Sequence, residues 1–119
     1  MKENIIRDKS YKFALRIVKL YKHLSDSKRE YVLSKQILRS GTSVGANIEE
    51  AIGGQSEKDF LHKISVAYKE ARETKYWINL LRDSEYINKD AAESLMDDCD
   101  EICRIISKIQ TTTKQKFNL

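Results

Sequence analysis

Apolar residues recur at intervals of three and four along most of the chain, which is the period of an amphipathic helix buried on one side. Four stretches keep this period, with polar or charged residues between the apolar positions. The stripes, in which Ser40 and Thr74 are the two small hydroxyl residues, consist of Phe13, Ile17, Leu20, Tyr21 and Leu24; of Leu33, Ile37, Ser40, Val44, Ile48 and Ala51; of Phe60, Ile64, Ala67, Ala71, Thr74, Ile78 and Leu81; and of Leu95, Cys99, Ile102, Ile106 and Ile109. The pattern therefore predicts an all-α fold of four helices.

Breaks in the period set the expected helix boundaries. The helices are predicted at about residues 8–24, 28–53, 57–82 and 89–110. Ser27 and Glu30 form a capping-box pattern at the start of the second helix. Ser56 and Asn88 are the expected N-caps of the third and fourth helices. The tail, residues 111–119, is expected to fray.

Short connections make neighbouring helices antiparallel, so the expected architecture is a single-domain, up-down-up-down four-helix bundle covering residues 1–119. A chain of 119 residues with no Pro and only four Gly fits this fold. No apolar run approaches the roughly 18 residues of a membrane span, and the first ten residues lack the apolar core of a signal peptide. We expect a cytoplasmic protein that does not act at a membrane.

The stretch RSGTSVGANIEEA places Gly41 and Gly45 inside the second predicted helix. A helix interior loses about 1 kcal/mol for each Gly relative to Ala, so a loop, a phosphate cradle or close packing has to explain them. No Gly-Lys-Ser/Thr follows and no strand precedes, which excludes a P-loop. On the helical wheel both glycines lie beside the apolar stripe, on a flank shared with Leu38 and Ile52. These four residues are a candidate helix-packing or oligomer interface, within one subunit or between two.

Positive charge is concentrated in the first third of the chain. Residues 1–40 contain eleven Lys and Arg against four Asp and Glu, a net charge of +7, so the remaining residues carry −3. Such asymmetry indicates an anionic partner or a self-complementary assembly. Lys9, Lys12, Arg16, Lys19 and His23 follow helical spacing and form a ridge within an arc of about 80°, nearly opposite the apolar stripe. The further cations near this ridge, if the first two helices are antiparallel neighbours, are Lys22, Lys28, Arg29, Lys35 and Arg39.

A row of cations repeated about every 5 Å along a helix can follow a phosphate backbone of RNA or DNA, gaining affinity by counterion release. All nine Lys and Arg of this set are therefore candidate nucleic-acid-binding residues. A solvated Lys-rich face, an acidic protein partner and a membrane surface are the alternatives. The membrane is disfavoured because the apolar face of the helix is needed for the core.

Candidate catalytic and metal-binding groups are sparse. Glu70-x-x-Glu73 and Asp97-x-x-Asp100 imitate the paired magnesium ligands of all-α nucleotide pyrophosphatases. However, Glu73 and Asp97 lie more than about 120° from their apolar stripes, so the four carboxylates would not converge on one ion. We expect solvated helix faces instead, with ion pairs such as Glu70 or Glu73 to nearby Lys and Arg. Cys99 and Cys103, one turn apart, are expected to be reduced core thiols, with a redox or metal role as the alternative. No catalytic residue, metal or cofactor is predicted.

Two long motifs resemble those of a known bacterial family. RSGTSVGANIEEA and FLHKISVAYKEARETKYWINLL are similar to the two motifs of the four helix bundle protein family, also called the 23S rRNA intervening-sequence protein or S23 family. The family pattern falls on Ser40 to Ile48 and on Lys69 to Trp77, and the resemblance covers roughly residues 8 to 110.

This resemblance implies a small antiparallel bundle that assembles as a homopentamer. Relatives are encoded within intervening sequences of 23S rRNA genes, and a similar protein is the accessory variability factor of diversity-generating retroelements, which binds nucleic acid and a reverse transcriptase. We therefore expect a non-enzymatic homo-oligomer that binds nucleic acid through its basic ridge. One alternative is a protein-interaction scaffold for an enzyme such as a reverse transcriptase. Another is a magnesium-dependent nucleotide hydrolase.

Overall fold

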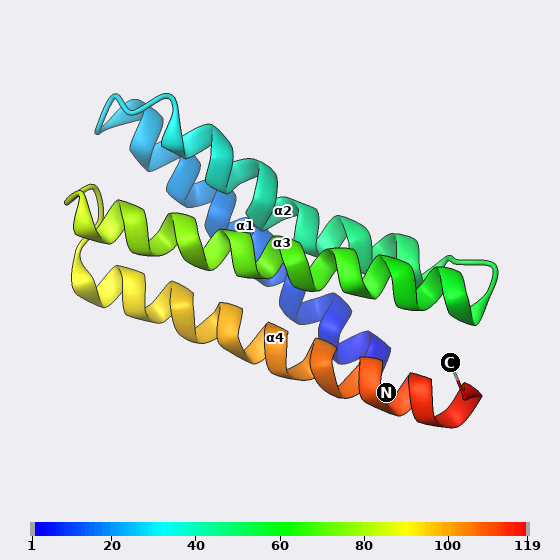
Figure 1. The fold of residues 1–119 in the computed structure, drawn as a ribbon. Coiled ribbons are helices and arrows are strands. Elements are labelled where there is room, and N and C mark those ends of the chain that lie inside the picture. The colour runs from blue at the N-terminus through cyan, green and yellow to red at the C-terminus, as the bar shows by residue number, and fades with distance from the viewer. Residues whose placement is uncertain (1, 119) are drawn as a thin grey trace.

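The chain folds into four consecutive helices, as the apolar spacing predicted (Figure 1). The computed structural model describes residues 2–118, with side chains from residue 5 onward. The helices are α1 (Lys2–Asp26), α2 (Leu33–Ile52), α3 (Glu57–Asp83) and α4 (Lys89–Phe117). They form an elongated body of 48 × 22 × 20 Å. The prediction of an all-α four-helix bundle with a single domain is confirmed.

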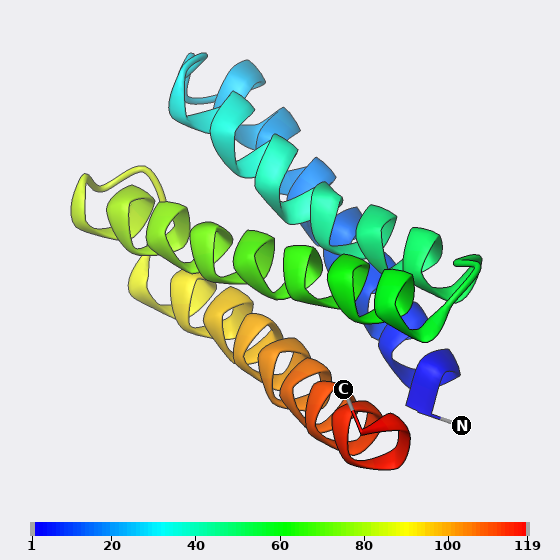
Figure 2. The same ribbon diagram turned by 45° about the vertical axis from the view of Figure 1, so that its right-hand side comes forward.

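The apolar residues of the predicted stripes, apart from Tyr21, form one continuous core along the bundle. One residue of each stripe illustrates this burial, since each is at most 1% exposed: Phe13, Ile37, Ile64 and Ile102. Consecutive helices pack extensively, whereas the fourth adjacent pair, α1 and α4, has the smallest contact. Both ribbon views show the α1–α2 hairpin diverging from the α3–α4 hairpin toward the end that carries the α1–α2 and α3–α4 loops (Figures 1 and 2). Between residues 2 and 118, no helix combines the length and apolarity that a membrane span requires.

The second helix begins at Leu33, so its expected start at residue 28 was wrong. The carboxylate of Glu30 accepts hydrogen bonds from the backbone N–H groups of Val32, Leu33 and Ser34 at 3.1, 2.9 and 2.7 Å. One side chain thus satisfies three N–H groups that the first turn of a helix leaves without partners. Ser27 does not form the expected capping box, because its N–H bonds His23 O at 2.9 Å at the end of α1. Glu30 therefore caps α2 with its side chain, without the partner residue of a capping box.

Of the other helix ends, the N-caps of α3 and α4 agree with the sequence prediction, whereas the start of α1 and the end of α4 do not. Ser56 Oγ and Asn88 Oδ1 accept from Asp59 N and Ala91 N, as expected of N-caps. However, α1 extends back to residue 2 instead of 8, because Ile6 is itself a core residue. Likewise α4 continues to Phe117 instead of ending near residue 110, with two lysines in its last turn where the helix dipole favours cations.

Gly41 and Gly45 admit α1 of the same chain to close contact with α2. A Cβ at Gly41 would lie 2.7 Å from Ile17 Cγ1, and a Cβ at Gly45 would lie 3.4 Å from the carbonyl oxygen of Ser10. Leu38 is half-buried against the core on the same helix. Ile52, at the end of α2, is 36% exposed. The groove that the glycines form is therefore filled by α1 of the same chain.

Replacing the two glycines by alanine should have different effects on stability. In Gly41→Ala the new methyl group overlaps the buried Ile17 side chain, so a net destabilisation of about 1–2 kcal/mol remains after the gain in helix propensity. In Gly45→Ala the new contacts are ordinary, so we expect a stability equal to or above that of the wild type, by up to about 1 kcal/mol. Urea unfolding measures both. Equal stability of the two variants would contradict this account of the groove.

The Glu30 cap should make folding sensitive to acid. Burial acts to raise the pKa of Glu30, but donation from Leu33, Ser34 and Val32 outweighs it and holds the pKa below its ordinary value. A carboxyl group with a lower pKa in the folded state stabilises the fold above its unfolded pKa, about 4.3, and loses that contribution as pH falls through the folded pKa.

Glu30→Gln should therefore cost about 1 kcal/mol at pH 7 and remove part of the acid sensitivity. Denaturant unfolding between neutral pH and about pH 3 tests this, with exposed Glu93→Gln as the matched control. The interpretation is wrong if Glu30→Gln and wild type lose stability in parallel on acidification.

Candidate nucleic-acid interface

Two cations of the predicted ridge on α1 are paired with α4. Lys9 Nζ lies 3.0 Å from Glu101 Oε1, and Arg16 Nη1 lies 2.7 Å from Asp98 Oδ2. Arg16 also donates to the hydroxyl of Ser94 at 3.0 Å and to its carbonyl oxygen at 3.3 Å. Partly exposed pairs of this kind contribute at most about 1 kcal/mol each. This part of the ridge joins α1 to α4, and its charge is largely balanced within the chain.

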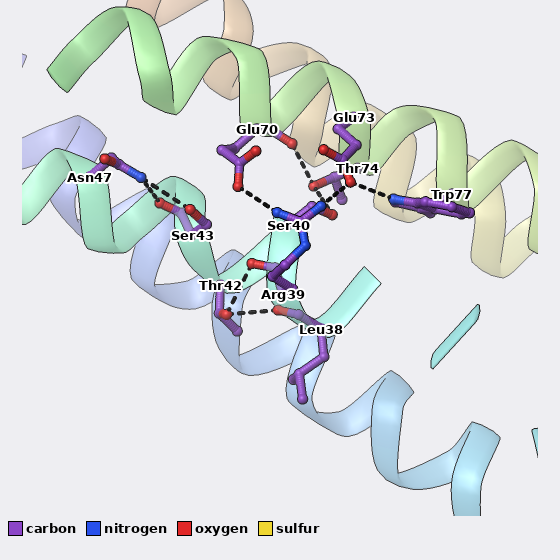
Figure 3. Close-up of polar contacts among 10 residues, drawn as sticks. All are labelled: Leu38, Arg39, Ser40, Thr42, Ser43, Asn47, Glu70, Glu73, Thr74 and Trp77. Carbon is purple, nitrogen blue, oxygen red and sulfur yellow. Dashed lines mark hydrogen bonds and ion pairs between the residues drawn. The ribbon is translucent and has the colours of Figure 1, made fainter. Parts of the chain in front are cut away.

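Arg39 is paired as well, with carboxylates of α3 (Figure 3). Its guanidinium donates to Glu70 Oε2 at 3.1 Å and to Glu73 Oε2, which also accepts from Trp77 Nε1 at 2.9 Å. The prediction that Glu70 and Glu73 pair with nearby basic residues is confirmed. Arg39 thus fastens α2 to α3.

Several polar residues of the two motifs bond to one another or to the backbone of their own helix (Figure 3). The hydroxyl oxygens of Ser40 and Thr74 lie 2.9 Å apart, and both residues are fully buried between α2 and α3. Thr42 Oγ1 donates to Leu38 O at 2.6 Å, and Asn47 Nδ2 donates to Ser43 O at 2.9 Å. The Ser40–Thr74 bond joins α2 to α3, whereas Thr42 and Asn47 bond to the backbone of α2 itself.

The other candidate cations are exposed. They are Lys12, Lys19, Lys22, Lys28, Arg29 and Lys35. Among the residues that the structure describes, no carboxylate lies within 4 Å of any of them. Five of the six belong to the last two turns of α1, the following loop or the first turn of α2. Most of the candidate cations without a carboxylate partner therefore lie at one end of the α1–α2 hairpin.

A cleft of about 830 Å³ opens at this end, between α1 and the α3–α4 connection. It is lined by Lys19, Leu20 and His23 of α1, by Lys28, and by Arg82, Asp83, Glu85, Tyr86, Ile87, Asn88, Lys89 and Ala91. Lys19 and Lys28 are thus brought together with Arg82, Tyr86 and Lys89, which the sequence prediction missed. No periodicity or motif marks these three residues, because only the packing of distant segments makes them neighbours.

A helix-terminating turn positions Tyr86 in the lining of the cleft. Tyr86 N donates to Leu81 O at 2.9 Å and Glu85 N donates to Arg82 O at 3.0 Å, the bond pattern of a Schellman motif. Glu85 takes the left-handed conformation that this motif requires, with φ of 68°. Asn88 then caps α4, so Lys89 is its first residue. Backbone hydrogen bonds thus fix the first end of the connection, and the side-chain cap of Asn88 fixes the second.

Cations outnumber carboxylates around the cleft. Lys19, Lys28 and Lys89 have no carboxylate within 4 Å among the described residues, whereas Arg82 Nε pairs with Asp83 Oδ1 at 2.8 Å. Donation by Arg82 holds the pKa of Asp83 below its usual range, so this carboxylate stays ionised and paired with Arg82. Leu20, Ile87 and Ala91 supply apolar lining. The cleft combines a cationic rim with an apolar floor.

The acidic pairs and the cysteines do not form a metal site. Asp100 pairs with Lys75 at 2.6 Å, and among the residues from 2 to 118 no three His, Cys, Asp or Glu side chains are grouped to hold an ion. Both cysteines are free thiols, as predicted. The interaction with Cys99 and the nearby Lys75 lower the pKa of half-buried Cys103 to about 7. The same interaction and burial raise the pKa of Cys99.

Comparison with known proteins agrees with the motifs. The family described as 23S rRNA-intervening sequence protein matches residues 2–108. A solved structure from Bacteroides thetaiotaomicron, described as a protein with unknown function from the S23 ribosomal protein family, is 51% identical. The match covers 93% of this chain and 99% of that one, with a TM-score of 0.92.

No curated protein matches the chain. Neither the family description nor the name of the solved relative states an enzymatic activity. Because the family match spans nearly the whole chain and includes both motifs, the chain belongs to the 23S rRNA-intervening sequence protein family.

Proposed function

We propose that this protein is a non-enzymatic homo-oligomer that binds nucleic acid electrostatically through the exposed, unpaired cations of α1, the α1–α2 loop and the start of α2. The observation that carries the proposal is the set of exposed cations without carboxylate partners, defined above. A cation that is already paired with a carboxylate gains little free energy by binding a phosphate, because its ion pair has to be broken first. An unpaired Lys neutralises a phosphate and releases its counterions directly. The unpaired set therefore replaces the full ridge as the binding surface.

A homo-oligomer would raise the affinity of this surface. Tyr11 and Leu15, four residues apart on α1, are 65% and 52% exposed, and a neighbouring subunit is one way to cover such side chains. The resemblance of the motifs supports five subunits in particular. Several copies of a weak electrostatic site on one particle bind a long polyanion with avidity that a single copy lacks.

Removing unpaired cations should weaken nucleic-acid binding more than removing the same number of paired ones. Lys12→Gln/Lys22→Gln and Lys9→Gln/Arg16→Gln both remove two positive charges from α1. We expect the first variant to bind RNA or DNA more weakly and to show a smaller salt dependence. The slope of log K against log salt is negative, and its magnitude should decrease by about 0.7–0.9 for each phosphate that the variant no longer neutralises. Fluorescence anisotropy at several salt concentrations measures this.

An equal weakening of binding in the two variants would contradict the assignment to the unpaired set. A wild-type protein that binds no nucleic acid at about 50 mM salt would reject the proposed function itself. Pull-down from lysate with and without nuclease tests the scaffold alternative, since a protein partner captured equally in both arms favours a scaffold.

The subunit number is a separate prediction. Five copies of a 13.9 kDa chain give a particle of about 70 kDa. Light scattering coupled to size-exclusion chromatography measures this mass without assuming a shape. A particle with the mass of one chain would contradict the oligomer, and any other stable multiple would correct its stoichiometry.

A further inference from the structure

We infer that the cleft between α1 and the α3–α4 connection binds one unpaired nucleotide of a nucleic-acid strand. This inference rests on the proposed function and assigns a ligand to one part of the binding surface. The cleft's volume of about 830 Å³ lies within the range of small-ligand pockets, roughly 300–1,000 Å³. It is therefore large enough for a base and its sugar. Its lining residues belong to the end of the bundle that carries the α1–α2 and α3–α4 connections.

The cationic rim fits the phosphates on either side of such a nucleotide. Lys19 comes from α1, Lys28 from the following loop and Lys89 from the start of α4, so the cleft is bordered by ammonium groups from three segments. The carboxylates that face it are Asp83, which is paired with Arg82, and Glu85. Lys89 also lies in the first turn of α4, where the helix dipole adds positive potential.

The floor of the cleft favours an unpaired base. Tyr86 offers a half-buried aromatic ring, and Leu20 and Ile87 extend the apolar surface beside it. A base within a duplex has both faces stacked on its neighbours and cannot reach this floor. An unpaired base can expose a face to an aromatic ring, an interaction that tolerates any base identity. The cleft should therefore discriminate single strands from duplexes without reading sequence. An acidic peptide would fit the rim but would gain little from the aromatic floor.

Binding of labelled oligonucleotides by cleft variants tests this inference. Fluorescence anisotropy compares a single-stranded RNA with a duplex of equal length, for wild type, Tyr86→Leu and Lys89→Glu. Tyr86→Leu keeps an apolar side chain and should weaken single-strand binding about fivefold or more while leaving duplex binding unchanged. Lys89→Glu should weaken single-strand binding, and its new carboxylate at the start of α4 favours the fold. Lys58→Glu, the same charge change in the first turn of α3, is the matched control.

The outcomes separate the cleft from the wider surface. Single-strand binding that is weakened in Tyr86→Leu and Lys89→Glu but kept in Lys58→Glu, with unchanged thermal unfolding, supports the cleft. Unchanged binding in both cleft variants, while Lys12→Gln/Lys22→Gln weakens it, overturns the cleft and leaves the proposed function standing. No binding by wild type overturns both.

Competition identifies the source of the nucleotide. Displacement of the labelled strand by an unlabelled strand, with little effect of free AMP at the same nucleotide concentration, supports a strand as the ligand. Equal displacement by AMP overturns that choice in favour of a free nucleotide. Displacement by a poly-glutamate peptide to the same extent overturns the nucleotide assignment, because it shows that the cleft recognises negative charge alone.

Discussion

The close contact of α1 with α2 at Gly41 is the constraint on which the rest of the structure depends. The side chain of Ile17 occupies the space that a Cβ at residue 41 would need. The backbone of α2 at Gly41 therefore lies in close contact with α1. This packing fixes the rotation of α1 about its axis. Lys9 and Arg16 consequently face α4, while Lys12 and Lys19 face solvent. The division of the basic ridge into paired and unpaired cations follows from it.

The seam between α2 and α3 explains why the two motifs are so distinctive in sequence. The buried Ser40–Thr74 hydrogen bond and the Arg39–Glu70 pair each join one motif, or its immediate flank, to the other. Such interactions need a particular polar residue on each side, because a buried hydroxyl without a partner costs stability. The residues of the two motifs are therefore set by the packing of α2 against α3. The cations proposed to bind nucleic acid lie outside both motifs, so members of the family can share the fold and differ in their partners.

Much of the fold was predictable from local pattern. The core positions, the free thiols and the caps at Ser56 and Asn88 follow from helical periodicity and capping preference. The start of α2 was not predictable in this way, since Ser27 and Glu30 match a capping box, yet the Glu30 carboxylate caps a helix that begins at Leu33. Two placements satisfied the same local rule. The burial of Ser34 and the three N–H donors to Glu30 selected the second.

The sequence by itself determined the helices, the faces they bury, the charge asymmetry and the family, because these properties depend on the order of residues within one segment. Tertiary structure decided which cations are neutralised, that α1 of the same chain fills the glycine groove, and that Tyr86 and Lys89 share a cleft with Lys19. Those outcomes depend on the relative rotation and divergence of helices. No single helix encodes these quantities, since they arise only when side chains from distant segments pack together.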